Sequence, residues 1–237
     1  MKARTGIPAP QHSGFKANFP DGFAIALKIP ACPMSALLFE NICRTVGREI
    51  AESELLAFRD LFSSQTLSKK EVLVREGERC RYTWFLQKGA AYSYYVNEAG
   101  EKNAVQFSIE GYWITDMYSF FSGRPALFHI ETLEETEALF LDRHRFEEAC
   151  ARFDFAERFF RILTQNAHAA QLYRIAKTNS ETAEHRYLEF ADRYPHFLAR
   201  IPQYLIASYL GIAPQSLSRI RQQLATRKPE APFSSPR

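Results

Sequence analysis

The chain has 237 residues, 46% of them hydrophobic and 24% charged, and a formal net charge of +3 at pH 7. This balance is typical of a globular protein and excludes a disordered chain, which would contain far fewer apolar residues. The small net charge excludes a polybasic chain, so any nucleic-acid-binding surface must be local. No segment approaches the roughly 20 apolar residues of a transmembrane helix, and no membrane contact is expected.

The cysteines and the N-terminal segment give no sign of export. The four cysteines form no CxxC pair and no spacing that suits zinc or an iron–sulfur cluster, so we expect free thiols in a reducing cytoplasm. They are Cys32, Cys43, Cys80 and Cys150. Residues 1–33 fit the three-part pattern of a signal peptide poorly. We expect them to form a disordered extension before a structured chain that begins at Met34.

Residues 36–62 have the apolar spacing of helices, with a second helix expected to start near Ser53. Residues 66–141 change to short β-branched and aromatic runs, separated by turn signals every 8–12 residues or so. This pattern favours an all-β sandwich or barrel, interrupted by a short helical segment over 117–121. The predicted strands cover residues 72–74, 82–86, 91–96, 104–109, 112–114, 128–133 and 138–141.

Helical spacing returns over residues 143–178. The later part predicts one helix of more than 20 residues, with more apolar surface than a small β-roll needs. That surplus favours a dimer seam, and the alternative is a helix that packs only on its own β-roll. The apolar face consists of Phe155, Phe159, Ile162, Leu163, Ala170 and Tyr173. A shorter helix follows over 182–193, and the tail from Lys228 is expected to be disordered.

Residues 202–225, PQYLIASYLGIAPQSLSRIRQQLA, carry the most specific pattern. Gly211 would end one helix in a left-handed conformation, and Pro214 fits the first turn of the next. This spacing predicts a DNA-binding helix-turn-helix, and an ordinary helical hairpin with a glycine turn is the alternative. The positions that carry the spacing are Gln203, Ala207, Gly211, Leu217 and Ile220.

The second of these helices has an aliphatic stripe and an opposite polar face without a carboxylate. Arginine can donate two hydrogen bonds to guanine, and glutamine can pair with adenine. We therefore expect Arg219 to read a base, and Arg221, nearer the inward flank, to contact phosphate or to pack. The predicted DNA-binding residues are Gln215, Ser216, Ser218, Arg219, Arg221 and Gln222.

In this order of elements, residues 36–226 resemble the Crp/Fnr family of bacterial regulators. The segment SLSRIR at 216–221 is similar to the family's recognition helix, with Arg219 in the place of the family's arginine and Gln215 in the place of its glutamate. That exchange predicts a different base preference. The aromatic-rich stretch FSIEGYWITDMYSFFSG is most similar to variants common in Bacteroidetes-type genomes.

The resemblance implies an α+β fold with a jelly-roll (double-stranded β-helix) domain like that of cyclic-nucleotide-binding proteins, a long dimerisation helix and a C-terminal helix-turn-helix domain. The implied divisions are a disordered extension, the β-roll, the long helix, the helix-turn-helix domain and a disordered tail. They cover residues 1–33, 34–153, 154–178, 179–227 and 228–237.

The resemblance also implies an effector cassette. Cyclic-nucleotide-binding members use an acid for the ribose hydroxyl, and an arginine with backbone N–H groups for the phosphate. Asp116 stands in the acid's place, but the arginine position aligns with Pro125 or Ala126, beside Arg124. We therefore expect an effector other than cyclic AMP, or none. The candidate pocket residues are Gly111, Asp116, Met117, Ser119, Gly123 and Arg124.

The function expected from these observations is a dimeric, DNA-binding transcription regulator in the cytoplasm. No nucleophile–base pair or glycine-rich phosphate loop indicates an enzyme, and no cofactor is expected. His129 and His168 lack a second ligand at a metal-binding spacing, so no metal site is expected. The expected partners are promoter DNA, a second copy of the chain, RNA polymerase and an effector of open identity. The alternative is a small-molecule or cyclic-nucleotide-binding module without DNA-binding activity.

Overall fold

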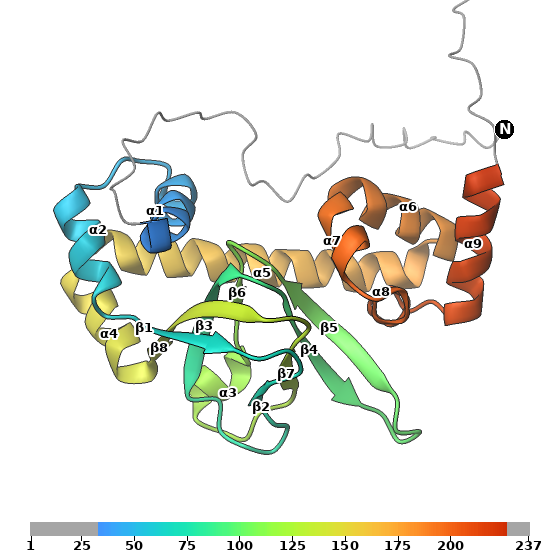
Figure 1. The fold of residues 1–237 in the computed structure, drawn as a ribbon, viewed down its shortest axis with the longest axis horizontal. Coiled ribbons are helices and arrows are strands. Elements are labelled where there is room, and N and C mark those ends of the chain that lie inside the picture. Colours follow the sequence, from blue (N-terminus) through green and yellow to red (C-terminus); the bar gives the residue numbers. More distant parts are fainter. Residues whose placement is uncertain (1–32, 227–237) are drawn as a thin grey trace, which may run out of the picture.

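A computed structural model describes residues 33–226 of the chain. The long helix α5 runs along the molecule, with the β-roll and the helices α1, α2 and α4 towards one end and α6–α9 at the other (Figure 1). The helices are α1 (Pro33–Val46), α2 (Glu52–Arg59), α3 (Met117–Ser122), α4 (Arg143–Arg152), α5 (Asp154–Ser180), α6 (Ala183–Arg193), α7 (Pro195–Arg200), α8 (Gln203–Leu210) and α9 (Pro214–Thr226). The expectations of disorder for 1–33 and 228–237 lie outside the described residues, except that Pro33 begins α1.

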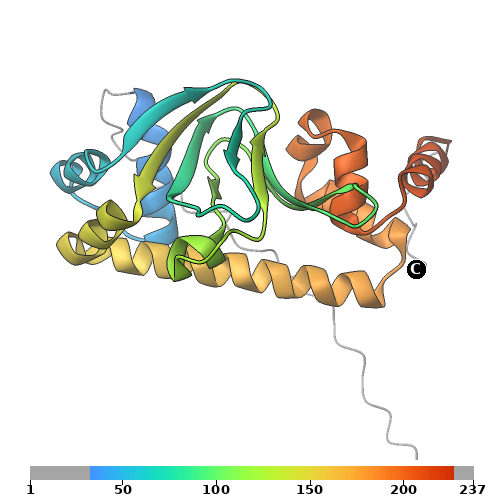
Figure 2. The same cartoon turned by 90° about the horizontal axis from the view of Figure 1, so that it is seen from below.

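Two four-stranded antiparallel sheets form the roll, in the orders β1-β8-β3-β6 and β2-β7-β4-β5. In the first sheet Trp84 pairs with Phe140, and in the second Tyr92 pairs with Phe107. Figure 2 shows the roll lying on one side of α5, with the β4–β5 hairpin extending towards α6–α9. The strands are β1 (Ser63–Leu67), β2 (Val72–Val74), β3 (Tyr82–Lys88), β4 (Ala91–Val96), β5 (Lys102–Ser108), β6 (Trp113–Ile114), β7 (His129–Thr132) and β8 (Thr136–Asp142).

Strand β3 shows how side-chain alternation separates two cores. Phe85 points out of the roll into a cluster with α1, α2 and the first half of α5. Trp84 and Leu86 point inward, where they pack with Phe120 and Ile130. Successive side chains of a strand face opposite sides, so a continuous apolar run fills both clusters.

Two elements were not predicted from the sequence. The run SSQTL forms β1, but only Leu67 of it is buried, so it lacks the apolar alternation that marks a strand. The shorter helix ends at Arg193 as expected, but Pro195 then begins α7 rather than a loop. Proline is favourable at the first position of a helix because its missing N–H has no partner to lose there.

Candidate nucleic-acid interface and effector cassette

The turn between α8 and α9 has the geometry that the sequence predicts. Gly211 adopts a left-handed conformation with φ of 64°, which an L side chain rarely takes. The Ile212 N–H donates to the Ala207 carbonyl over 2.9 Å, and the Ile212 side chain is buried in the corner. Pro214 is the first residue of α9. These contacts hold the two helices in a fixed crossing.

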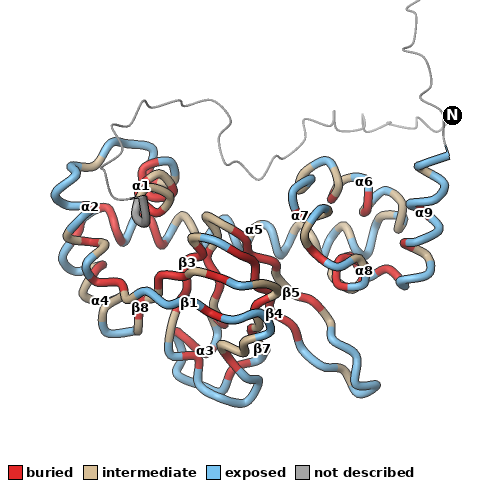
Figure 3. Tube along the Cα trace, viewed as in Figure 1, coloured by how far each residue is buried: buried red, intermediate tan, exposed pale blue. Residues whose placement is uncertain are grey.

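Packing fixes the rotation of α9 about its own axis. Leu217 and Ile220 are buried against α6 and α8, and Leu224 is partly buried in the same cluster. Figure 3 shows that α9 is largely exposed elsewhere, whereas α8 is largely buried. The helix therefore presents one defined face to solvent.

The predicted DNA-binding residues lie on the solvent side of α9. Ser216 is half-buried and the others, Gln215, Ser218, Arg219, Arg221 and Gln222, are exposed. The helix PQSLSRIRQQLAT contains no carboxylate, and within residues 33–226 neither arginine of α9 has an ion-pair partner. Both guanidinium groups are therefore available to an anionic ligand such as a phosphate or to a guanine edge.

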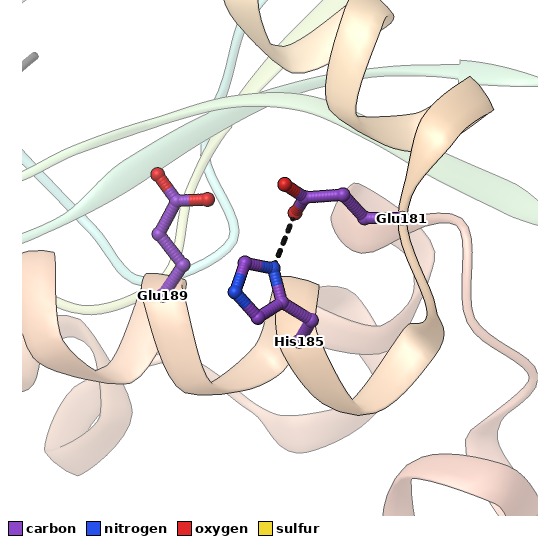
Figure 4. Close-up of side chains that lie close together, drawn as sticks. All are labelled: Glu181, His185 and Glu189. Atoms are coloured by element: carbon purple, nitrogen blue, oxygen red, sulfur yellow. Dashed lines mark hydrogen bonds and ion pairs between the residues drawn. The ribbon is translucent and has the colours of Figure 1, made fainter. Parts of the chain in front are cut away.

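The corner between α5 and α6 is closed by a network of charged groups. Glu181, His185 and Glu189 have ligand atoms within 4.8 Å of one another, which is the one group of metal-ligating type found in the described chain (Figure 4). The carboxylates already have partners, because Lys177 binds Glu181, and Arg193 donates to Glu189 over 3.0 Å. The Nδ1 atom of His185 lies 2.6 Å from Glu181. The contacts therefore describe an ion-pair network rather than an open metal site.

Arg186 also holds this corner, and sequence reasoning did not single it out. Its guanidinium donates to the Glu181 carbonyl over 2.7 Å and to the Gly211 carbonyl over 3.3 Å. One side chain thus joins the end of α5 to the turn of the helix-turn-helix. The partners are 5 and 25 residues away, so the pattern of the sequence carries no signal for the second contact.

Asp116 serves as a local clamp in the candidate effector cassette. It is 1% exposed, and its Oδ1 accepts from the Ser119 N–H over 2.8 Å as the N-cap of α3. Its Oδ2 accepts from the N–H groups of Leu127 and Phe128, over 2.7 and 3.1 Å. Both oxygens therefore bind the protein's own backbone in a buried position, whereas a ribose-binding acid must be reachable by a ligand hydroxyl.

The other cassette residues do not form one pocket with Asp116. Ser119 is buried and donates to the Arg124 carbonyl over 2.6 Å, and Gly123 ends α3 in the left-handed conformation. The Arg124 side chain is exposed and donates to the Tyr118 hydroxyl over 3.3 Å. Gly111 lies elsewhere, against Leu37 of α1. Met117 is half-buried on the first turn of α3.

Two hollows of the described residues lie away from α3. One of about 260 Å³ lies between the β4–β5 hairpin, α5 and α8, and is lined by Tyr95, Arg174 and Tyr209 among others. The second, of about 250 Å³, lies between α1 and the β5–β6 turn. The space inside the roll is instead occupied by Trp84 and Phe120, both 4% exposed. The geometry therefore offers no preformed nucleotide pocket at Asp116.

The second half of α5 has one face that covers α6 and α8 and one that faces solvent. Tyr173 donates to Glu189 over 2.5 Å, and Arg174 donates to the Tyr209 carbonyl over 3.3 Å. Leu172 and Ile175 of this half are 53% and 55% exposed, and Ile175 also borders the hollow beside the β4–β5 hairpin and α8. Two large aliphatic side chains one turn apart leave an apolar surface that the other described residues do not cover. The apolar face predicted from the sequence is not this surface, because Phe155 and Phe159 are buried in the chain's own core. None of the described helices combines the length and the apolar character that a membrane span requires.

Comparison with known families identifies the β-roll. Residues 64–153 match the family described as the cyclic nucleotide-binding domain. The roll is therefore similar to cyclic nucleotide-binding domains. No curated protein matches the chain by sequence.

Solved structures share the arrangement of this domain with the long helix and the C-terminal helices. FixK2 from Bradyrhizobium japonicum is 20% identical, with a TM-score of 0.60 over 70% of this chain and 85% of its own. The c-di-GMP-responsive global regulator CLP of Xanthomonas campestris is 11% identical, with a TM-score of 0.57 over 74% and 92%. A protein from Eubacterium rectale assigned to the Crp/Fnr family of transcriptional regulators is 10% identical, with a TM-score of 0.57 over 74% and 84%.

These likenesses confirm the predicted fold class and, at the level of the fold, the resemblance to Crp/Fnr regulators. At such low identity they carry no residue-level roles over to this chain. The DNA-binding and effector residues therefore stay predictions, and the geometry described above supports only those on α9.

The clamp at Asp116 predicts the effect of its removal. Asp116→Ala should lower the free energy of unfolding by about 2–4 kcal/mol, because it removes a helix cap and leaves two further backbone N–H groups without an acceptor. Asp142→Ala is the matched control, since Asp142 caps α4 through a single bond to Arg145, and it should cost about 1 kcal/mol. Urea unfolding followed by circular dichroism measures both. Equal losses in the two variants would contradict the clamp.

The same geometry predicts that cyclic AMP does not bind in the cassette. Both oxygens of the buried Asp116 accept from backbone N–H groups, and the exposed Arg124 guanidinium donates to the Tyr118 hydroxyl. Titration calorimetry should therefore show no heat of binding with cyclic AMP at micromolar protein. Micromolar or tighter binding would contradict this expectation, and loss of that binding in Arg124→Ala would show which guanidinium holds the phosphate.

Proposed function

We propose that the chain is a dimeric, DNA-binding transcription regulator of the Crp/Fnr type, acting in the cytoplasm with α9 as its recognition helix. One observation carries the proposal. The packing of Leu217 and Ile220 turns a polar face of α9 to solvent, and that face has no carboxylate and two arginines without an ion-pair partner among residues 33–226. A helix that enters the major groove must present donors to base edges and must not repel phosphates.

The positions on α9 suggest a division of roles. Arg219 lies well away from the buried stripe, so its two donors can reach O6 and N7 of a guanine, while Gln215 and Gln222 can pair with adenines. Arg221 lies closer to the buried flank and is placed for the phosphate backbone. Ser216 and Ser218 add shorter hydroxyl contacts. The first helix, α8, would cross the backbone as in other helix-turn-helix proteins.

A dimer follows from the symmetry of such recognition. Two recognition helices reach successive major grooves when the half-sites are one helical turn apart, about 34 Å. The exposed face of α5 that contains Leu172 and Ile175 is the surface we assign to the second copy. For the β-roll we propose an effector other than cyclic AMP, or none, as the sequence predicts. Because the similar CLP is named as c-di-GMP-responsive, cyclic dinucleotides belong in the first thermal-shift screen.

Operator selection tests the function directly. The purified chain is mixed with a pool of random DNA duplexes, bound duplexes are amplified through several rounds, and the enriched sequence is measured by fluorescence anisotropy. We expect a two-fold symmetric sequence that binds more tightly than unrelated duplex by 10³ or more. Binding that stays equal for enriched and unrelated duplexes would contradict the proposal and would favour a ligand-binding module without DNA recognition.

The dimer surface gives a second prediction. Light scattering at micromolar concentration should report about twice the 27.3 kDa of one chain. Leu172→Glu and Ile175→Glu should each shift the mass towards that of the monomer, because a charge would be buried in the apolar seam. Leu188→Glu is the control, since Leu188 is 41% exposed on α6, away from this face. A monomeric wild-type chain that stays monomeric on DNA would contradict the seam.

The rotation of α9 gives a third prediction. Arg219→Ala should cost about 1–3 kcal/mol on the selected operator and relax the preference at one base pair per half-site. Arg221→Ala should weaken binding to all sequences alike and lower the salt dependence by about one unit per protomer. Titrations on matched and base-substituted operators at several salt concentrations separate the two effects. The reverse pattern would show that the reading face is assigned wrongly.

A further inference from the structure

The helix-turn-helix and the β-roll share one apolar core. Phe107 of β5 packs against Phe197 of α7 and Tyr209 of α8, with ring centroids 6.1 and 5.2 Å apart. Tyr112, after the β5–β6 turn, packs against Phe197 at 5.8 Å. The buried cluster continues from these rings to Leu217 and Ile220 beneath the recognition helix. The position of α9 is thus linked to the β4–β5 hairpin through packed side chains.

Helix α8 also covers the edge of the second sheet. β5 is the outermost strand of that sheet and would present free N–H groups along its edge. The Ala104 N–H donates to the Ser208 hydroxyl over 3.0 Å, and this hydroxyl can in turn donate to the Lys102 carbonyl over 3.3 Å. An edge backbone group of the roll is therefore satisfied by a side chain of the helix-turn-helix.

A charged clasp closes the same interface on its other side. Arg200, the last residue of α7, binds Glu110 with both of its terminal nitrogens, over 2.5 and 3.0 Å. It also binds Glu134, between β7 and β8. Glu110 is itself held by the Gly89 N–H, which donates to it over 2.8 Å. Arg200 thus contacts the β5–β6 and β7–β8 connections directly, and the β3–β4 connection through Glu110.

The clasp is better suited to fixing an orientation than to adding stability. Its three side chains are 30%, 33% and 40% exposed, and exposed ion pairs contribute little to the free energy of folding. A forked guanidinium–carboxylate pair is, however, directional, because both donor–acceptor lines must be in register. Apolar contacts alone would let the helix-turn-helix shift on the β-roll more easily than this two-bonded ion pair does.

We propose that Arg200 is a positioning residue for DNA recognition, which rests on the function proposed above. With Glu110 and Glu134 it holds the helix-turn-helix in one orientation on the β-roll. In a dimer joined through α5, that orientation sets the separation and the angle of the two recognition helices. The half-site spacing that the dimer accepts is then determined by a contact more than 10 residues before α9 begins.

The experiment measures spacing tolerance. Wild type first selects an operator from random duplex, and the two half-sites are then moved apart or together by one and two base pairs. We expect wild type to prefer its own spacing on the order of tenfold over a one-base-pair change, since each added base pair also rotates one half-site about the DNA axis. Arg200→Gln and Glu110→Gln should flatten this preference to within a few-fold, and Arg200→Lys should lie between, because lysine keeps the charge but loses the fork.

A matched control and a DNA-free measurement complete the design. Arg152→Gln removes the same charge from an exposed pair within α4 and should leave the spacing profile unchanged. Hydrogen exchange should show loss of protection in Arg200→Gln that is confined to β5 and α8, with α1 and α2 as stable as in wild type.

The outcomes separate this inference from the proposed function. An unchanged spacing profile in Arg200→Gln would overturn the positioning role while leaving DNA binding intact. Equal loss on every spacing, with protection lost throughout the chain, would show a merely structural role and would also overturn it. If wild type selects no operator at all, the proposed function fails, and the positioning role fails with it.

Discussion

The packing of the first half of α5 on the β-roll is the interaction on which the rest of the structure depends. Phe159 and Phe160 of α5 lie against Trp113, with ring centroids 5.8 and 5.5 Å apart, and Phe155 packs on Phe58 of α2 at 5.2 Å. Burying aromatic side chains of this size is the largest favourable contribution available to such a helix. This cluster anchors one end of α5, so the other end must extend beyond the roll.

The extended half of α5 then places the C-terminal helices where the β4–β5 hairpin can reach them. Arg174 and Arg186 join α5 and α6 to Tyr209 and Gly211 of the helix-turn-helix, while Arg200 and Ser208 join the bundle to the roll. The C-terminal helices therefore do not hang from a free linker. Any change within the roll that moves the hairpin would be passed to α9 through packed rings and directional hydrogen bonds, which have few alternative arrangements.

Sequence pattern was informative wherever the contacts are local. Spacing within one element was enough to predict the left-handed Gly211, the buried stripe of Leu217 and Ile220, and the strands of the roll. Pattern failed at β1, whose exposed residues carry no alternation, and at α7, a short helix that begins at Pro195 and has no apolar periodicity long enough to predict it. At the cassette, sequence could place Asp116 beside α3 but could not show that the loop after α3 occupies its second oxygen.

The order of the elements and the polar face of α9 follow from the sequence, because periodicity and turn chemistry act between residues a few positions apart. The fold class followed from the resemblance of that order to Crp/Fnr regulators. Which helix faces stay exposed, and how the β-roll meets the C-terminal helices, depend on tertiary packing. The Arg200–Glu110 clasp joins residues 90 positions apart, and the Ala104–Ser208 contact joins residues 104 apart. Such pairs leave no periodic trace, since their geometry arises only when α5 and the roll have packed.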